Sequence, residues 1–286
     1  MRKYTKYGWF LTLAGVAFFF ISCHNDETRE TVHLVIGGVA GEAAWGPNNV
    51  IAVGDARSIL YRDAGGGPVN EIKPDPPIDV YELDWSPDGK TIICAGLPSG
   101  AAETSLYKIK FPNGDASLFL SGGISAPAWS PDGRTIAYVK WPGGDAGTVE
   151  LIPADGGTPA VIAAGGKFYN PSWTADSRRV VFSQYFDESQ RHVVWSVDIE
   201  TKDKVYVTEG FDPKWAPGGD WLAVTRQDPD EYSVYLVSPK EGTEIRFIGP
   251  VDGVPDASAR WPAWSPDGKW LACCADRGEW GIYKKQ

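Results

Sequence analysis

Histidine, cysteine and methionine are scarce in this chain of 286 residues, which contains three, four and one of them. The histidines His24, His33 and His192 are too far apart in the sequence to form a His-x-x-x-His metal pair. The sequence also lacks a Gly-x-Ser-x-Gly nucleophile elbow, a phosphate-binding loop and a dinucleotide fingerprint. We therefore assign no catalytic residue, no metal ligand and no cofactor, and we expect a protein that is not an enzyme.

Positive charge is also in short supply, since 27 Lys and Arg residues face 37 Asp and Glu residues, for a net charge of −10. Three basic residues, Arg2, Lys3 and Lys6, fall within residues 1–22, which contain no acidic residue. Loss of that segment would take the net charge from −10 to −13. A chain this acidic repels phosphate backbones and anionic head groups, which excludes nucleic acid as the main partner.

Only one long apolar run is present, and it extends from Gly8 to Ile21 behind the basic start of the chain. It is short for a membrane span of about 20 residues. A basic start, a short apolar run and the small residue Ser22 before a cut are typical of an export signal. We expect residues 1–22 to be such a signal, with an uncleaved membrane anchor as an alternative.

The end of this segment, Phe20-Ile21-Ser22-Cys23, resembles a bacterial lipoprotein signal, although that family usually has Leu in place of Phe20. The resemblance implies that Cys23 carries lipid and that residues 23–30 form a short tether. It also implies a place in the cell envelope. The absence of Asp after Cys23 favours the outer membrane, with the protein facing the periplasm. Export as a cleaved, soluble protein remains an alternative.

A tryptophan-based repeat organises the rest of the chain. Trp85-Ser86-Pro87-Asp88-Gly89 recurs at Trp129 and Trp264, and weaker copies begin at Trp45, Trp173 and Trp215. Successive Trp residues are 40, 44, 44, 42 and 49 positions apart. Propellers repeat at about 40–50 residues per four-stranded blade. The period therefore predicts an all-β fold, a six-bladed β-propeller of four-stranded blades over residues 31–286.

The local chemistry of the repeat agrees with short strands and tight turns. In Ser-Pro-Asp-Gly, Pro presets φ, Asp accepts from nearby backbone N–H groups, and Gly takes a positive φ. A strand ends at each Trp, and a β-rich strand such as 135–139 follows the turn. The turn carboxylates could cap the turn or bind calcium. We favour capping, because the repeat spreads them around the ring. They are Asp88, Asp132, Asp176 and Asp267.

The last unit has room for only three strands. The first ends at Trp264, and the other two cover residues 270–274 and 280–283. The N-terminal stretch Thr31–Gly38 supplies a spare strand ahead of the first Trp. We predict that residues 31–37 pair with the C-terminal strands, close the last blade and protect its open edge.

Cysteine offers little chemistry outside Cys23. Cys94 and Cys273 both fall nine residues after the Trp of their repeat, with another blade between the two. A disulfide is therefore not expected at the short Cα separation that it requires. Cys274 should face the other side of its strand from Cys273. We interpret all three as buried thiols.

The unit Pro-x-Trp-Ser-Pro-Asp-Gly-(Lys/Arg)-x-Ile resembles the repeats of the TolB-type propeller family. Such repeats also occur in prolyl-oligopeptidase-type peptidases and oligogalacturonate lyases. The resemblance implies the fold and is weak for function, because one fold hosts many tasks. TolB itself carries an α/β domain before its propeller, whereas here only residues 25–30 separate Cys23 from the first strand.

The non-repeated residues gather in loops that strand order places on one rim, and the insertion from Pro250 to Arg260 lengthens that rim. Aromatic and Arg side chains are typical anchors of interfaces. They indicate a non-enzymatic scaffold that recruits an envelope protein, with ordinary solvated loops, a lyase or a small-ligand or glycan-binding propeller as alternatives. The binding residues assigned to the rim are Glu42, Tyr81, Glu82, Tyr169, Asn170, Tyr185, Phe211, Asp212, Arg260 and Trp261.

Overall fold

The computed structural model describes residues 31–33, 42–228, 231–248, 258–275 and 279–284, and these form 23 β-strands and no helix. The prediction of an all-β chain is confirmed. Within these residues there is accordingly no helix with the length and hydrophobicity to cross a membrane. The predicted signal, Cys23, its tether and residues 250–257 of the predicted insertion lie outside the described residues.

Most strands fall into four-stranded antiparallel sheets whose order follows the chain. The first two sheets contain β2 (Ala43–Trp45), β3 (Val50–Asp55), β4 (Ser58–Asp63), β5 (Asn70–Ile72), then β6 (Ile78–Trp85), β7 (Thr91–Pro98), β8 (Ser105–Lys110) and β9 (Ala116–Leu120). A later sheet contains β17 (Phe211–Trp215), β18 (Leu222–Asp228), β19 (Glu231–Ser238) and β20 (Thr243–Ile248).

The middle of the chain forms one seven-stranded sheet in place of two separate ones. It runs through β10 (Ile124–Trp129), β11 (Thr135–Lys140), β12 (Gly147–Pro153), β13 (Ala160–Trp173), β14 (Arg179–Phe186), β15 (Arg191–Asp198) and β16 (Lys204–Glu209). Residues 160–166 of β13 pair with β12, and residues 167–173 pair with β14. No turn interrupts the backbone between these two segments, so one strand serves two neighbouring units.

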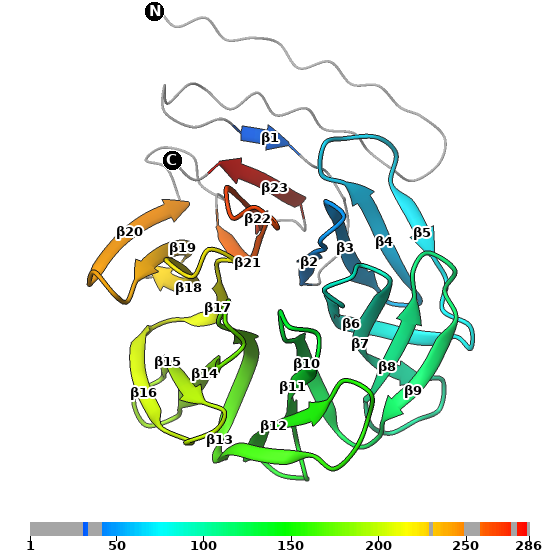
Figure 1. The fold of residues 1–286 in the computed structure, drawn as a ribbon, viewed down its shortest axis with the longest axis horizontal. Coiled ribbons are helices and arrows are strands. Elements are labelled where there is room, and N and C mark those ends of the chain that lie inside the picture. Colours follow the sequence, from blue (N-terminus) through cyan, green and yellow to red (C-terminus); the bar gives the residue numbers. More distant parts are fainter. Residues whose placement is uncertain (1–30, 34–41, 229–230, 249–257, 276–278, 285–286) are drawn as a thin grey trace, which may run out of the picture.

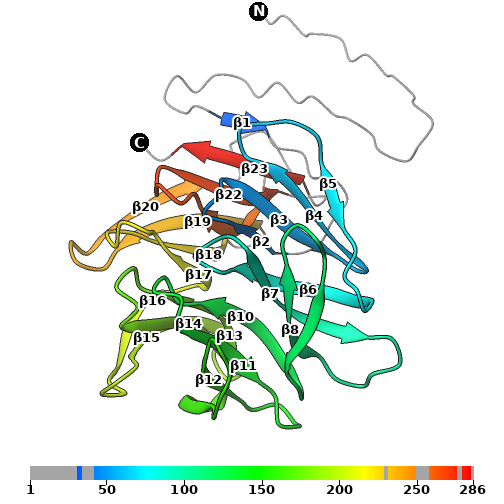
Figure 2. The same cartoon turned by 45° about the vertical axis from the view of Figure 1, so that its right-hand side comes forward.

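The final sheet joins the two ends of the described chain. Its order is β1 (Thr31–His33), β23 (Glu279–Lys284), β22 (Trp270–Ala275) and β21 (Ala259–Trp264). Backbone pairing between β1 and β23 places Thr31 opposite Tyr283 and His33 opposite Gly281. β1 lies beside β23 in both views of the ribbon (Figures 1 and 2). Residues 34–37 of the predicted closing strand lie outside the described residues.

The first strand of every unit ends at its repeat tryptophan, as predicted, and lies toward a common centre (Figure 1). Each first strand contacts the next one along the chain, in the order β2, β6, β10, β13, β17 and β21, and β21 contacts β2. The short outer strands β5, β9, β16 and β20 lie at the periphery (Figure 1). Residues on the first strands of distant units are therefore neighbours.

Apolar clusters fill the space between adjacent sheets. The second strands are buried on both faces, so they are continuous apolar runs without the alternation of a half-buried strand. Residues 92–95 have 0% exposure, and the run at 136–139 has the same burial. Repeat tryptophans bridge the sheets, since the Nε1 groups of Trp85 and Trp173 donate to the carbonyl oxygens of Ala44 and Ala128 at 3.1 and 3.0 Å.

The turn carboxylates cap their own turns. Asp88 accepts from the Ser86 hydroxyl at 2.7 Å and from the Lys90 N–H at 3.1 Å. The Ser86 hydroxyl thereby holds the pKa of Asp88 below its usual value, with the Lys90 bond second in effect. Asp132, Asp176 and Asp267 make the same pair of bonds. The capping interpretation accounts for all four residues.

The described cysteines are buried thiols, as predicted. Cys273 packs into the cluster shared with β18 and β19, whereas Cys274 packs toward β2 and β3. The two therefore face opposite sides of their strand. Burial raises the pKa of the Cys94 thiol to about 12, so this thiol is not a nucleophile at neutral pH.

The capping network predicts a stability cost for Ser130→Ala. Ser130 is 1% exposed, and its hydroxyl donates to Asp132 and accepts from the Thr135 N–H at 3.0 Å. Its loss leaves that N–H unpaired, so we expect the free energy of unfolding to fall by about 1–3 kcal/mol in urea titrations. Ser117→Ala on the exposed face of β9 is the control. Equal effects of the two changes would contradict the capping role.

Candidate binding pocket at the bulges of the first strands

The first strands carry a repeated β-bulge three residues before the tryptophan. There Ala126, Asn170, Asp212 and Trp261 have φ angles of 48°, 48°, 50° and 55°, and each precedes a proline. The strand register shifts across the same positions. A bulge redirects the side chain that it carries. Four units thus present one non-repeated side chain each at equivalent places.

Three of these bulges meet at one cavity of about 180 Å³, which we call the bulge pocket. It is enclosed by side chains from β13, β15, β17, β19 and β21. Its lining residues are Tyr169, Asn170, His192, Phe211, Asp212, Tyr232, Arg260 and Trp261.

Aromatic rings form a continuous wall along the bulge pocket. The imidazole of His192 lies 5.8 Å from the Tyr169 ring and 5.0 Å from the Phe211 ring, measured between centroids. Phe211 in turn lies edge-on to Tyr232 at 5.7 Å. At the end of the wall the Arg260 guanidinium stacks 4.3 Å from the Trp261 ring centroid. Such rings offer an apolar surface that also attracts cations.

A buried carboxylate lies at the inner side of this wall. Asp212 is 4% exposed, and its Oδ1 accepts from the Asn170 amide at 2.5 Å. Its Oδ2 is buried without a hydrogen-bond partner among the described residues. Burial, together with repulsion from Glu42, raises the pKa of Asp212 well above its usual value, against the opposing effects of Lys214, Asn170 and Arg260.

Further carboxylates lie behind the pocket on other first strands. Glu42 accepts from the Asn170 amide and lies 3.8 Å from the Lys214 ammonium. Glu82 accepts from the Ala126 N–H at 3.1 Å. Burial, then repulsion from Glu42, raises the pKa of Glu82 to about 6.

Asp84 completes the group, which we call the axial acidic cluster and define as Glu42, Glu82, Asp84 and Asp212. Asp84 accepts from the backbone N–H groups of Trp129 and Trp85 at 2.7 and 2.9 Å. Burial raises its pKa, while the charge of Lys214 opposes the rise. Four carboxylates therefore act on one lysine at the centre of the molecule.

His192 does not add a positive charge. Burial lowers the pKa of its imidazole, so the ring is neutral at pH 7. Its Nδ1 is buried without a partner among the described residues. The residue is the second of β15, and Tyr232 is the second of β19.

The structure brings together most of the ten residues that the sequence assigned to binding. Six line the bulge pocket, namely Tyr169, Asn170, Phe211, Asp212, Arg260 and Trp261. Glu42 and Glu82 belong to the axial acidic cluster behind it, and the Tyr185 ring lies 4.8 Å from His192. Tyr81 is 44% exposed on β6 and does not line the pocket.

Sequence reasoning missed His192, Tyr232 and Lys214. A usable signal existed for the first two, because both are the second residue of the third strand of their unit. Lys214 stands directly before a repeat tryptophan, and nothing in its local sequence indicates that Glu42, far away in the chain, lies beside it.

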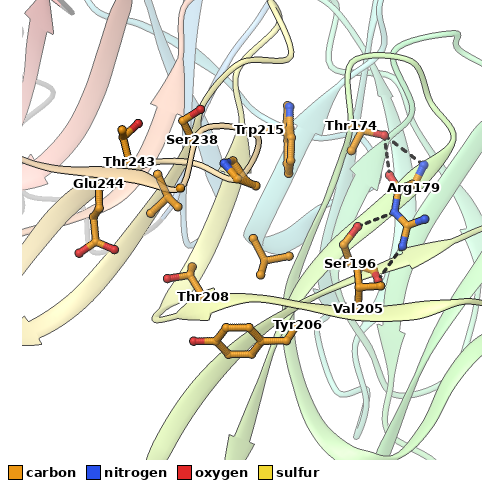
Figure 3. Close-up of a pocket in the computed structure, with 14 residues that line it drawn as sticks. Thr174, Arg179, Ser196, Val205, Tyr206, Thr208, Trp215, Ser238, Thr243 and Glu244 are labelled. Atoms are coloured by element: carbon orange, nitrogen blue, oxygen red, sulfur yellow. Dashed lines mark hydrogen bonds between the residues drawn. The ribbon is translucent and has the colours of Figure 1, made fainter.

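A larger groove of about 480 Å³ lies between β16 and the start of β20 (Figure 3). Figure 3 shows Arg179 and Ser196 on one side of it and Thr243 and Glu244 on the other. Arg179 already donates to Ser196 Oγ at 2.8 Å and to the Ser196 carbonyl at 3.0 Å. None of the groove's lining residues is among the described residues with a buried, unpartnered polar atom. The bulge pocket is therefore the stronger candidate site.

In the part of the chain that the structure describes, no group of three or more His, Cys, Asp or Glu residues is placed to hold a metal ion.

Comparison with known proteins supports the fold. The model of the WD domain, G-beta repeat, matches residues 252–278. No curated protein sequence matches the chain. A structure assigned as TolB from Agrobacterium tumefaciens superposes with a TM-score of 0.66 at 17% identity, over 85% of this chain and 89% of that one.

Two further structures are similar. TolB from Acinetobacter baumannii has a TM-score of 0.61 at 14% identity, over 88% of this chain and 65% of that one. An oligogalacturonate lyase in complex with manganese has a TM-score of 0.60 at 16% identity, over 86% of this chain and 76% of that one. The chain therefore has a TolB-like β-propeller fold, and the predicted fold resemblance is confirmed.

The raised pKa of Glu82 predicts how stability changes with pH. The folded state retains a proton between the ordinary pKa of 4.5 and about 6. The free energy of unfolding therefore falls by up to about 2 kcal/mol across this interval as pH rises, and stays lower above it. In Glu82→Gln, which keeps an acceptor for the Ala126 N–H, this loss should be absent.

Urea titrations from pH 4.5 to 8 measure the difference between the two proteins at each pH. Glu103→Gln, at an exposed position, is the control and should leave the pH profile of the wild type unchanged. A constant difference between wild type and Glu82→Gln across this range would show that Glu82 has an ordinary pKa.

Proposed function

We propose that this chain is a non-enzymatic lipoprotein of the bacterial cell envelope, whose propeller binds a protein partner through the face that carries the bulge pocket. The observation that carries this proposal is the bulge pocket itself. It combines aromatic residues, a stacked Arg260 and a buried carboxylate oxygen of Asp212 that no described residue satisfies. Aromatic and Arg side chains around a desolvated polar group are the composition of interface hot spots.

The proposal includes a ring of six four-stranded blades, with β1 as the closing strand of the last. The circuit of contacts from β2 through β21 and back to β2 supports the ring. The first half of β13 pairs with β12 and the second half pairs with β14. In this proposal the seven-stranded sheet is therefore two blades, and β13 is the last strand of one and the first strand of the next. The backbone pairing of β1 with β23 supports the closure.

The proposed location rests on the N-terminal sequence. The basic start, the apolar run and Phe20-Ile21-Ser22-Cys23 support export and lipid attachment at Cys23. Attachment through more than one acyl chain would hold the acidic propeller at the membrane without a basic patch. We place it at the outer membrane, facing the periplasm.

A carbohydrate-active role is the second candidate, and the similarity to the manganese-bound lyase favours it. The bulge pocket lacks the basic and metal-ligating groups that acid–base chemistry on a uronate would draw on, apart from His192 and Arg260. Lyase and glycan-binding assays on the purified chain test this role directly.

The binding proposal predicts that Trp261→Ala and Arg260→Ala reduce capture of the partner at least tenfold. The full-length protein, expressed in its own membrane, is cross-linked and recovered, and co-purifying proteins are quantified by mass spectrometry. Tyr206→Ala is the matched control, because Tyr206 is a 58% exposed aromatic residue on the outer strand β16. Thermal melts establish that each variant is folded. Capture that depends on Tyr206 and not on Trp261 would place the interface elsewhere.

The lipoprotein proposal predicts that Cys23→Ser abolishes incorporation of radiolabelled palmitate and releases the protein from the membrane fraction. Cys94→Ala should keep both properties, because the Cys94 thiol is buried in the core. Membrane attachment that survives Cys23→Ser without label would point to an uncleaved anchor.

A further inference from the structure

Asp212 carries a buried carboxylate oxygen, Oδ2, that lacks a hydrogen-bond donor among the described residues. The residue as a whole is 4% exposed. An unpartnered buried carboxylate oxygen costs more than an ordinary lost hydrogen bond. A donor supplied from outside the described residues would remove that cost.

The nearest cations are already engaged with other groups. The Arg260 guanidinium stacks on the rings of Trp261 and Tyr232, at 4.3 and 5.5 Å from their centroids. The Lys214 ammonium is directed to Glu42 at 3.8 Å. Neither satisfies Asp212 Oδ2, and Asp212 is one of the residues that line the pocket.

The surrounding charge selects the sign of the missing donor. Asp212 belongs to the axial acidic cluster, in which it shares the Asn170 amide with Glu42 and is repelled by that carboxylate, against the opposing effects of Lys214, Asn170 and Arg260. An anionic ligand would meet this negative field, and a purely apolar one would leave Oδ2 unpaired. A cation forms a charge-assisted hydrogen bond with the carboxylate and is also attracted to the faces of Phe211 and Tyr232.

The volume of the pocket restricts the size of that cation. A cavity of about 180 Å³ corresponds to about six waters at roughly 30 Å³ each. A lysine side chain has five non-hydrogen atoms, with an apolar stem suited to the aromatic wall and an ammonium at its end. The arginine side chain is longer and ends in a bulkier, planar guanidinium, so it fits this volume less well.

We infer that the bulge pocket takes a lysine side chain of the partner, with its ammonium on Asp212 Oδ2 and its stem along Phe211 and Tyr232. This inference rests on the proposed function, because it assigns the partner's anchoring residue to the same face. In this arrangement Asp212 selects the charge of the ligand. The aromatic wall selects its length.

The test uses the full chain and small probes, so it does not require the partner. Nα-acetyl-lysine N-methylamide is titrated and binding is followed by tryptophan fluorescence and by calorimetry. Nα-acetyl-norleucine N-methylamide is the neutral probe, because its n-butyl side chain keeps the four carbons of the lysine stem and lacks the ammonium, and n-butylammonium is the free amine. We expect the lysine probe to bind at least tenfold more tightly than the norleucine probe.

Asp212→Asn should weaken binding of the lysine probe at least tenfold and leave the protein folded, since it removes a buried charge and keeps the shape. Asp187→Asn is the control, because Asp187 is an exposed carboxylate paired with Lys167 at 2.7 Å. Equal binding of the lysine and norleucine probes, or equal binding by wild type and Asp212→Asn, would overturn the inference. Binding of n-butylammonium without the lysine probe would overturn it in favour of a small free amine.

These outcomes separate the inference from the proposed function. Partner capture that depends on Trp261, together with no binding of the lysine probe, would leave the proposed function standing and the lysine assignment wrong. Binding of the lysine probe through Asp212, together with no captured protein, would support the lysine assignment and contradict the protein-partner proposal.

Discussion

Face-to-face packing of twisted sheets is the constraint on which the rest of this structure depends. Each second strand is buried on both faces. The apolar clusters combine side chains from two neighbouring sheets, so the core lies between the sheets. Tryptophan Nε1 groups bond across the same seams, as Trp85 does to the Ala44 carbonyl. Each apolar cluster between two sheets needs both of those sheets, so neighbouring units stabilise one another. The pairing of β1 with β23 links the first and last described strands in the same way.

This packing leaves the first strands free to carry polar residues. Most of them have a strand partner on one edge only, so a bulge there interrupts few ladder bonds. The bulges turn Asn170 and Asp212 toward the centre, where the first strands converge and water is largely excluded. The raised pKa values of Glu82 and Asp212 are the electrostatic consequence of that convergence. A scaffold stabilised at its seams can hold such an unfavourable cluster at its centre.

The site has a chemistry of its own within a widely used fold. The chain shares a TolB-like propeller with proteins at 14–17% identity, a level at which the fold is retained and individual side chains are not. Its bulge pocket is formed by residues outside the Trp-Ser-Pro-Asp-Gly repeat, because the repeat residues are used for the turns and the seams. The binding function that we propose therefore depends on the few positions that the repeat leaves unconstrained.

The amino-acid sequence by itself determined the local structure. The spacing of the tryptophans, the Ser-Pro-Asp-Gly turns and the apolar second strands predicted where strands begin and end, and the first strands do end at Trp45, Trp85 and Trp129. It also marked six residues of the bulge pocket as non-repeated loop positions. Only the tertiary structure decided which of them meet. Asn170 bonds to Glu42 across 128 residues, while Tyr81, which lies four residues before its repeat tryptophan as Tyr169 does, stays exposed. Turn and strand signals act over a few residues, whereas the curvature that brings distant units together results from the packing of all the sheets.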